Sequence, residues 1–390
     1  MLSNIEGMAG GKLADGPGGG IPPWKKGQKI DLKVTHWCLW GPRRSGMYET
    51  VRELIAAENQ IEGVLAGMCA VPKEGTSKRE AARYLQGGMT DINHPEMRTQ
   101  DWGWAYKFAD VHMIHYTFDK RLGKLKPKVF MAHGTPEAVL EGSLKDKDPG
   151  NSLLSGAEWI NKFEGTIVTS QRGKMFWGAF DPTGGSKMHV VNKGIDLGWW
   201  QKSGTTHLSG EPSVLYGEVW RGIKHPALLF YAMDELYKRN NEARLNAWSL
   251  TVKRNLWTAF IGQADFWKFM GQDNIPGVVD YPEHYYSRGD VLVSPVVYGD
   301  VSRVAQEAMA CGCPVVSWDT DPYGENYPYK MAKGFDIMDM ADKIEEAYNE
   351  VLDDKEAVAK KCRKIAETYW DINEEARSIV QILRKIVSDQ

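Results

Sequence analysis

Short apolar runs alternate with amphipathic segments along most of this chain. The first apolar run, residues 30–40, is followed by a glycine turn and by a segment, 47–60, whose apolar residues recur about every 3.6 positions. This order of strand, turn and helix is typical of the start of a parallel α/β unit. Further runs predict strands at 61–71, 109–118, 126–137, 165–171 and 186–196. We therefore expect a parallel sheet with helices on both of its faces.

The same alternation starts again near residue 211, which indicates a second α/β half. Residues 211–240 predict strand, turn and helix, and later apolar runs predict strands at 246–252, 275–281, 290–295 and 313–318. The chain closes with two helical patterns. We predict two Rossmann-like domains and a last helix, with the bounds 30–190, 191–370 and 371–390. The Gly/Pro-rich residues 1–29 are predicted to be an irregular arm, with an ordered lid over a site as the alternative.

Composition agrees with a globular protein of two domains, because the chain has 390 residues, 42% of them hydrophobic. The net charge of −3 gives no electrostatic footprint for bulk nucleic-acid binding. The 15 Trp and 16 Tyr residues favour a cleft for polar, flat or sugar-like ligands, which such rings often line. The basic run Lys120–Lys128 is predicted to be a solvated loop, with attraction of an anionic lipid surface or nucleic acid as the alternative.

Five Cys residues without the spacing of a disulfide framework indicate reduced thiols in a cytosol-like compartment. Cys311 and Cys313 are predicted to be small buried thiols, with a metal or redox pair as the alternative. No apolar run approaches about 18 residues, and the N-terminus lacks a basic-then-apolar signal pattern. We expect no transmembrane segment and a cytoplasmic location, with peripheral attachment to a membrane as the alternative.

The stretch from Tyr298 to Asp321 carries the most specific chemistry. It follows the strand 290–295 with a loop, and then with a helix for which Ser302 is the predicted N-cap. The first amides of such a helix favour a diphosphate, and a carboxylate at Glu307 can accept hydrogen bonds from a ribose. An ordinary strand–helix–strand with capping is the alternative. A dinucleotide fingerprint after the first strand and a P-loop are both absent, which weakens nicotinamide and NTPase functions.

The stretch SPVVYGDVSRVAQEAMACGCPVVS, residues 294–317, resembles the donor-binding motif of retaining glycosyltransferases of the GT-B fold, the family-four (group one) type. That motif has two acids flanking seven residues, followed by Ala-Met-Ala-x-Gly-x-Pro-Val-Val. Further segments resemble the family in the same order, so that the resemblance covers about 30–370: 38–55, 109–118, 129–137, 190–197 and 214–226. The resemblance implies a GT-B-like α/β fold, with two Rossmann-like domains facing across a cleft and a C-terminal helix that packs back toward the first.

The resemblance also implies where the nucleotide of the donor binds. Glu307 would accept hydrogen bonds from the ribose. Arg221 and Lys224 would neutralise the diphosphate, because the leaving group needs its developing charge stabilised. The start of the motif helix would lie beside the same phosphates, with Val301, Ser302 and Arg303.

Other matching residues would lie near the sugar. His133 ends a strand and would hydrogen-bond the transferring sugar or assist the acceptor. Gly46 would let its loop approach the donor or acceptor closely. The sequence departs from the family at Gly299, where the first acid is expected; Asp300, one residue along, would contact the sugar hydroxyls instead. A second departure is Glu218, which stands where the family has Arg.

The predicted activity is therefore transfer of a sugar from a UDP- or GDP-linked donor to an acceptor hydroxyl of a glycan, lipid or other compound, by a retaining, metal-independent hexosyltransferase. No cofactor and no metal site are expected. Asp319–Asp321 imitates the metal motif of the other glycosyltransferase fold, but it is predicted to be a loop. Three alternatives stay open: a sugar-nucleotide or glycan-binding protein with impaired catalysis, a GT-B sugar-nucleotide epimerase, and a transferase that glycosylates modified DNA bases, which the net charge disfavours.

Overall fold

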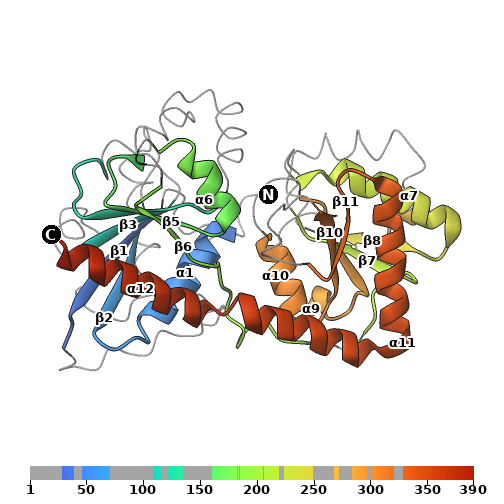
Figure 1. The fold of residues 1–390 in the computed structure, drawn as a ribbon. Helices are drawn as coiled ribbons and strands as arrows, with labels where there is room; N and C mark the ends of the chain where they lie inside the picture. The colour runs from blue at the N-terminus through green and yellow to red at the C-terminus, as the bar shows by residue number, and fades with distance from the viewer. Residues whose placement is uncertain are drawn as a thin grey trace, which may run out of the picture. The chain divides into compact units, whose positions relative to one another are not determined.

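The computed structural model describes residues 29–38, 46–70, 109–115, 122–134, 160–181, 183, 185–204, 206–218, 224–248, 268–271, 283–296, 301–319 and 328–390. The chain divides into two units (Figure 1). The first unit is Met1–Trp199 with Asp371–Gln390, and the second unit is Trp200–Trp370. The sequence placed the border between the halves after residue 190, whereas the structure places it after Trp199.

The first unit contains a six-stranded sheet in which every strand pair is parallel, in the order β2-β1-β3-β4-β5-β6. Its strands are β1 Leu32–Cys38, β2 Val64–Ala70, β3 Val111–His115, β4 Lys128–Met131, β5 Gly165–Val168 and β6 Met188–Val190. Almost every described strand residue is buried, as expected for a parallel sheet that is covered on both faces. The continuous apolar runs of the sequence are explained by this burial.

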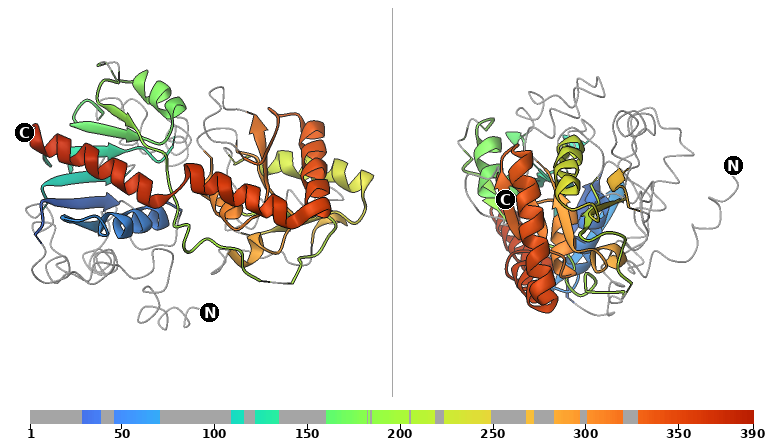
Figure 2. Two further views of the ribbon diagram at one scale, coloured as in Figure 1. Left: turned by 60° about the horizontal axis from the view of Figure 1, so that its bottom comes forward. Right: turned by 90° about the vertical axis from the view of Figure 1, so that its right-hand side faces the viewer.

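Helices cover both faces of this first sheet. α1, Gly46–Glu58, and α12, Ile372–Ser388, pack on one face, where Leu54 and Ile379 join the sheet residues Val34 and Met113 in one core. α6, Gln171–Gly178, supplies Trp177 to the core of the opposite face. The last helix therefore belongs to the first unit although it is distant in sequence, and Figure 2 shows it running along that sheet.

The second unit contains a five-stranded sheet, again parallel at every pair, in the order β11-β10-β9-β7-β8. Its strands are β7 Ser213–Tyr216, β8 Arg244–Ala247, β9 Val291–Ser294, β10 Val315–Asp319 and β11 Lys330–Lys333. Its helices are α7 Pro226–Arg239, α9 Glu283–Tyr286, α10 Arg303–Ala310 and α11 Ile337–Tyr369. α11 contains a kink at Asp354, whose backbone is not helical.

Most of the predicted elements are present, and both halves are α/β with parallel sheets. The predicted strand at 246–252 instead begins at Arg244, and the predicted strand at 275–281 lies outside the described residues. β11 was not predicted. It is an edge strand whose only buried residue is Ala332, so the sequence KMAK shows no apolar run there.

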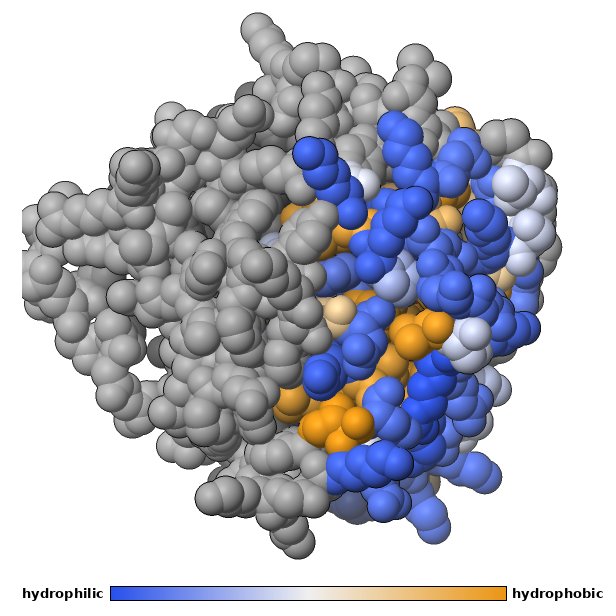
Figure 3. Space-filling model, turned by 90° about the vertical axis from the view of Figure 1, so that its left-hand side faces the viewer, coloured by the Kyte–Doolittle hydropathy of each residue, from blue (hydrophilic) through white to orange (hydrophobic). Residues whose placement is uncertain are grey.

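The surface and the thiols complete the picture of the fold. Described residues that face the viewer in Figure 3 are mostly hydrophilic, with smaller groups of hydrophobic side chains among them. Among the described helices, none is both long and apolar enough to cross a membrane. Cys311 and Cys313 are buried and form no disulfide bond, as predicted, and burial raises the pKa of the Cys313 thiol to about 12.

Candidate functional site

The motif helix α10 is fixed at both ends by local hydrogen bonds. Ser302 is its N-cap, as predicted, and its Oγ accepts a hydrogen bond from the Ala305 amide at 3.2 Å. At the other end, the Gly312 amide donates to the Met309 carbonyl at 3.0 Å and the Cys313 amide donates to the Ala308 carbonyl at 2.9 Å. This is the Schellman arrangement, and it needs a residue with positive φ, which Gly312 supplies at +85°.

A hydrogen-bonded cluster joins α10 to the carboxyl ends of two neighbouring strands. Ser294, the last residue of β9, donates a hydrogen bond to Glu218 Oε1 at 3.3 Å, and its Oγ lies 3.1 Å from Ser302 Oγ. Glu218 lies just beyond β7, which pairs with β9. In open α/β sheets, ligands bind at the carboxyl ends of strands. The cluster therefore lies where this kind of sheet holds a ligand.

Glu218 forms an ion pair with Lys224 that was not foreseen from the sequence. Lys224 Nζ lies 2.9 Å from Glu218 Oε2, and the side chains are 14% and 5% exposed. Burial by itself would raise the pKa of the Glu218 carboxyl, but Lys224 and hydrogen bonds from Ser302 and Ser294 outweigh it, so that the pKa lies below its ordinary value. Glu218, which stands where the family pattern has Arg, is thus the charged partner of Lys224, and Lys224 is the residue that was predicted to bind the diphosphate.

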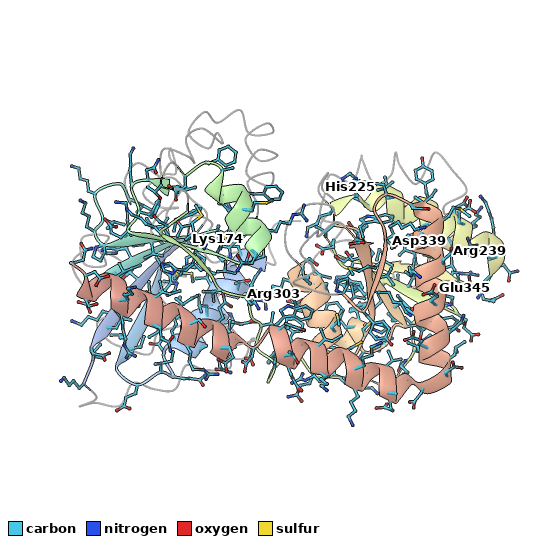
Figure 4. The ribbon with its side chains drawn as sticks, viewed as in Figure 1. Lys174, His225, Arg239, Arg303, Asp339 and Glu345 are labelled. Carbon is cyan, nitrogen blue, oxygen red and sulfur yellow. The ribbon has the colours of Figure 1, made fainter. Side chains whose placement is uncertain are left out.

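Glu307 is the centre of a second buried cluster. Its Oε1 accepts a hydrogen bond from Arg303 Nε at 2.6 Å, and its Oε2 accepts one from the Tyr286 hydroxyl at 2.9 Å. Arg303 lies at the start of α10, as Figure 4 shows. Burial and the Glu307 charge together hold the pKa of Tyr286 well above its ordinary value, so Tyr286 stays a hydrogen-bond donor.

Aromatic rings surround this second cluster. The Arg303 guanidinium lies 5.8 Å from the centre of the Trp200 ring, and Trp200 contacts Tyr286 at a centroid distance of 6.1 Å. Trp248 packs against Tyr286 at 5.5 Å. A side chain on Gly217 would come within 2.6 Å of the Trp248 ring, so a glycine is needed there for this ring to pack against the backbone.

Together these residues form a candidate anion-binding site with balanced charges. Lys224 and Arg303 are cations, and Glu218 and Glu307 compensate them within the second unit. The amides at the start of a helix point away from its body, and the helix dipole adds a positive potential there. A diphosphate could be held by these amides and by cations that are already ordered, while the carboxylates could accept hydrogen bonds from sugar hydroxyls.

A chain of histidines lies in the first unit. His36 Nδ1 lies 2.8 Å from His115 Nε2, and His115 Nδ1 lies 2.6 Å from His133 Nε2. At the other end, His36 Nε2 lies 2.7 Å from Glu58 Oε2. Successive rings are nearly parallel, with interplanar angles of 21° and 27°. His133, which was predicted to bind the sugar, is therefore the end of a four-residue chain in which Glu58, His36 and His115 were not predicted as site residues.

The strand register explains why three histidines meet. Cys38 of β1 pairs with His115 of β3, and His115 pairs with Met131 of β4. His36 and His133 lie two residues from these partners and so share their face of the sheet. His112 lies an odd number of residues from His115 and so points to the opposite face, where its Nδ1 accepts a hydrogen bond from Trp37.

Several predicted site residues gain no new partner in the structure, and two cannot be placed. Arg221 and Asp300 lie outside the described residues. Gly46 is the exposed first residue of α1, and a side chain there would meet none of the described residues within 4 Å, so their packing does not explain this glycine. Val301 is half-buried beside the N-cap. The roles of these residues toward a ligand stay predictions.

A metal site is not visible in the part of the chain that the structure describes, where no group of three or more His, Cys, Asp or Glu side chains could hold a metal ion. In the histidine chain, each described ring nitrogen but one points at the next member, so the nitrogens do not converge on a point.

Comparison with known proteins supports the sequence motif. Residues 214–350 match the family model described as "Glycosyl transferases group 1". The matched range contains Lys224, Ser302, Arg303 and Glu307. No curated protein sequence matches the chain.

Many solved structures share the fold at low sequence identity. Sucrose-phosphate synthase from Thermosynechococcus elongatus is 15% identical with a TM-score of 0.67, covering 92% of this chain and 100% of its own. HepE of Anabaena, solved with UDP and glucose, is 13% identical with a TM-score of 0.62, covering 91% and 100%. TarM is 15% identical with a TM-score of 0.54, covering 70% of this chain, which spans about half of TarM (54%). The fold is therefore that of the GT-B glycosyltransferases, and the second unit carries the match to glycosyl transferases group 1.

Proposed function

We propose that this chain is a glycosyltransferase that moves a sugar from a nucleoside diphosphate donor to an acceptor hydroxyl, with retention of anomeric configuration and without a metal ion. The match of residues 214–350 to glycosyl transferases group 1 carries this proposal. It is supported by the buried polar cluster at the carboxyl ends of β7 and β9, because that cluster lies within the matched range. A location in the cytoplasm is part of the proposal.

In this proposal, the predicted site residues have separate tasks. The α10 amides near Val301 and Ser302 and the side chains of Arg303 and Lys224, with Arg221, bind the diphosphate and stabilise it as it leaves. Glu307 binds the ribose, since its carboxylate oxygens retain lone pairs beside the hydrogen bonds from Arg303 and Tyr286. Asp300 and His133 contact sugar hydroxyls, and Gly46 lies beside the donor or acceptor.

A thermal-shift screen with UDP, GDP and their glucose conjugates tests donor binding. UDP is the first probe, because the HepE structure contains it. A ligand at about 100 times its Kd should stabilise the folded state by about 2.7 kcal/mol. Absence of a shift with every nucleotide tested would contradict the proposal.

Variants of Glu307 test whether the nucleotide binds at the motif helix. Glu307→Ala should remove the nucleotide-induced shift, whereas Glu345→Ala, which removes an exposed carboxylate of α11 (Figure 4), should keep it. Each shift is measured against the same variant without nucleotide, because Glu307→Ala also leaves Arg303 and Tyr286 without this partner. Glu307→Gln serves as a second variant that keeps one oxygen acceptor. A full shift in both Glu307 variants would refute the ribose assignment.

Product analysis separates transfer from the alternatives. A transferase should hydrolyse a bound donor sugar slowly when no acceptor is present, with retained configuration of the released sugar. A binding protein with impaired catalysis should release no sugar, and an epimerase should interconvert the free donor. The alternative of a binding protein with impaired catalysis has a specific reason to be tested. The ion pairs of Lys224 with Glu218 and of Arg303 with Glu307 reduce the net positive charge of the proposed diphosphate site.

A further inference from the structure

Three buried side chains and the half-buried His133 form a single line of hydrogen bonds in the first unit, and this line ends on a buried nitrogen that has no partner among the described residues. The line runs from Glu58 through His36 and His115 to His133. The Nδ1 atom of His133 is buried and accepts or donates no hydrogen bond among the described residues. A buried polar atom without a partner costs free energy. The geometry thus points to a missing partner at this end of the line.

We propose that Glu58, His36 and His115 form a buried proton relay, which presents His133 Nδ1 as a hydrogen-bond acceptor for a ligand hydroxyl and withdraws this acceptor when the relay takes up one proton. Glu58, His36 and His115 are positioning residues here, because they act on the ligand only through the tautomer of His133.

The direction of the relay follows from the carboxylate at its start. An ionised Glu58 can only accept, so His36 carries its proton on Nε2 and leaves a lone pair on Nδ1. That lone pair accepts from His115 Nε2, and the Nδ1 lone pair of His115 accepts from His133 Nε2. Every imidazole is then neutral with one proton, and the lone pair of His133 Nδ1 stays available as an acceptor.

Uptake of one proton reverses all of these bonds. A proton from solvent binds His133 Nδ1, the Nε2 proton of His133 moves to His115 Nδ1, and the Nε2 proton of His115 moves to His36 Nδ1. The Nε2 proton of His36 then moves to Glu58 Oε2, so the chain gains one proton and loses its single negative charge. Each link keeps one hydrogen bond, but His133 Nδ1 is now a donor.

Because the relay is buried, this reversed state has a lower free energy than a state in which one of the rings is a charged imidazolium. His36, His115 and Glu58 are fully buried. Burial lowers the pKa of His115 well below its ordinary value and lowers that of His133 to about 3, so an imidazolium is disfavoured at either ring. Storing the proton on Glu58 removes a buried charge instead.

Other charged or titratable side chains lie near the relay without being part of it. Lys193 lies near His133 and further lowers the pKa of that ring. Glu375 of α12 and Glu53 of α1 face the Glu58 end, and burial raises the pKa of Glu375 to about 8, which keeps it uncharged at neutral pH. Glu53 accepts a hydrogen bond from the Asp196 amide and is not part of the line. The opposite-face His112 bonds to Trp37 and also stays outside it.

The position of the relay indicates the kind of ligand. His36 lies within β1, His115 is the last residue of β3, and His133 lies beyond the end of β4. The line therefore leads from the interior of the sheet to its carboxyl edge, where ligands of such sheets bind. A lone-pair acceptor there selects a hydroxyl donor. That this hydroxyl belongs to a sugar nucleotide rests on the proposed function.

Nitrogen NMR of the full-length chain with ¹⁵N-labelled histidine tests the relay without any ligand. At neutral pH, two-bond correlations should show protonated Nε2 and unprotonated Nδ1 in His36, His115 and His133 alike. On acidification, all three rings should change to the opposite tautomer together, without becoming imidazolium. Rings with the other tautomer at neutral pH, or rings that become imidazolium independently, would overturn the proposal.

Two matched variants of α1 assign the proton store. Glu58→Gln should abolish the joint tautomer change, because an amide cannot store the proton, whereas Glu53→Gln on the same helix should retain it. Persistence of the change in Glu58→Gln would overturn the role of Glu58. If Glu58→Gln does not fold, the wild-type spectra still decide, since they report the tautomers directly.

Calorimetry with UDP-glucose tests the link to a ligand. Below the midpoint of the relay, binding must expel the stored proton, so affinity should fall tenfold per pH unit, with one proton released. This dependence of the UDP-glucose affinity on pH should vanish in Glu58→Gln and persist in Glu53→Gln. A pH-independent affinity in the wild type would overturn the acceptor role of His133. Failure of every variant to bind UDP-glucose, with the NMR result intact, would count against the proposed function and leave the relay standing.

Discussion

Lys224 Nζ lies 2.9 Å from Glu218 Oε2, so a cation expected to meet a diphosphate is already paired inside the second unit. The pair lies at the end of β7, beside Ser294 and the α10 N-cap Ser302. A phosphate that binds there has to share Lys224 with the carboxylate. The negative charge of Glu218 thus lowers the positive potential of the candidate site.

Replacing Glu218 with Gln should strengthen nucleotide binding. The change removes a negative charge next to Lys224 while it keeps the shape of the side chain, and we expect the Kd for UDP to fall by about tenfold, equivalent to about 1.4 kcal/mol. Titration calorimetry at two salt concentrations measures it. Glu346→Gln, which removes an exposed carboxylate that pairs with Lys343 on α11, should have no effect. An unchanged or weaker affinity for UDP in Glu218→Gln would show that Lys224 does not serve the phosphates.

Glu375 should make the protein less stable as the pH rises. Burial raises the pKa of its carboxyl from 4.5 to about 8, against the effect of the hydrogen bond from the Gly194 amide. The folded state therefore keeps a proton that the unfolded state loses, and the stabilisation is complete below pH 4.5 and is lost as the pH rises to about 8.

Glu375→Gln removes this dependence, because an amide carries no titrating proton. Its free energy of unfolding should match the wild type near pH 4.5 and exceed it increasingly toward pH 8, by at most about 1.4 kcal/mol per pH unit. Urea unfolding at several pH values checks it. The neighbouring variant Glu374→Gln, at an exposed position, should show no such divergence. Parallel pH curves for Glu375→Gln and the wild type would contradict the raised pKa.

His112 should have the opposite dependence on pH. Burial, with a smaller effect of Lys128, lowers the pKa of its ring from 6.5 to about 4. Between these values the unfolded chain binds a proton that the folded chain excludes, so stability falls as the pH falls from 6.5 to 4.

His112→Asn should flatten this part of the stability curve, since Asn can still accept the Trp37 hydrogen bond but does not titrate. Thermal unfolding between pH 4 and pH 6.5 measures the change, which is at most about 1.4 kcal/mol per pH unit. The exposed His284→Asn is the control. An equal acid sensitivity in His112→Asn and the wild type would mean that His112 titrates normally.

Gly312→Ala should destabilise the second unit. The position has φ of +85°, and the new methyl group would lie 2.8 Å from Ala359 Cβ. We expect a loss of about 1–3 kcal/mol, because both the backbone and the contact are strained. Gly178→Ala, where a methyl group meets no atom of the described residues within 4 Å, should change stability by less than about 0.5 kcal/mol. Chemical denaturation compares the two, and equal stabilities would rule out a special role of Gly312.

The local features of the motif could be predicted from the sequence because neighbours along the chain create them. Ser302 caps α10 through a bond to a residue three positions away, and Gly312 ends the helix through equally local bonds. The apolar runs likewise predicted two parallel α/β sheets, since strands buried on both faces are continuously apolar. The edge strand β11 was missed because one buried residue leaves no such run.

Only the tertiary structure decided which side chains share a site. Sequence patterns located His115 and His133 on their strands, but the register of β1, β3 and β4 brings them to His36, and the packing of α1 adds Glu58. The amino-acid sequence by itself thus determined most of the elements and the motif helix with its N-cap, because these depend on short-range patterns. The ion pair of Glu218 and the histidine line depend on contacts between distant segments, which form only when the sheets and helices have packed.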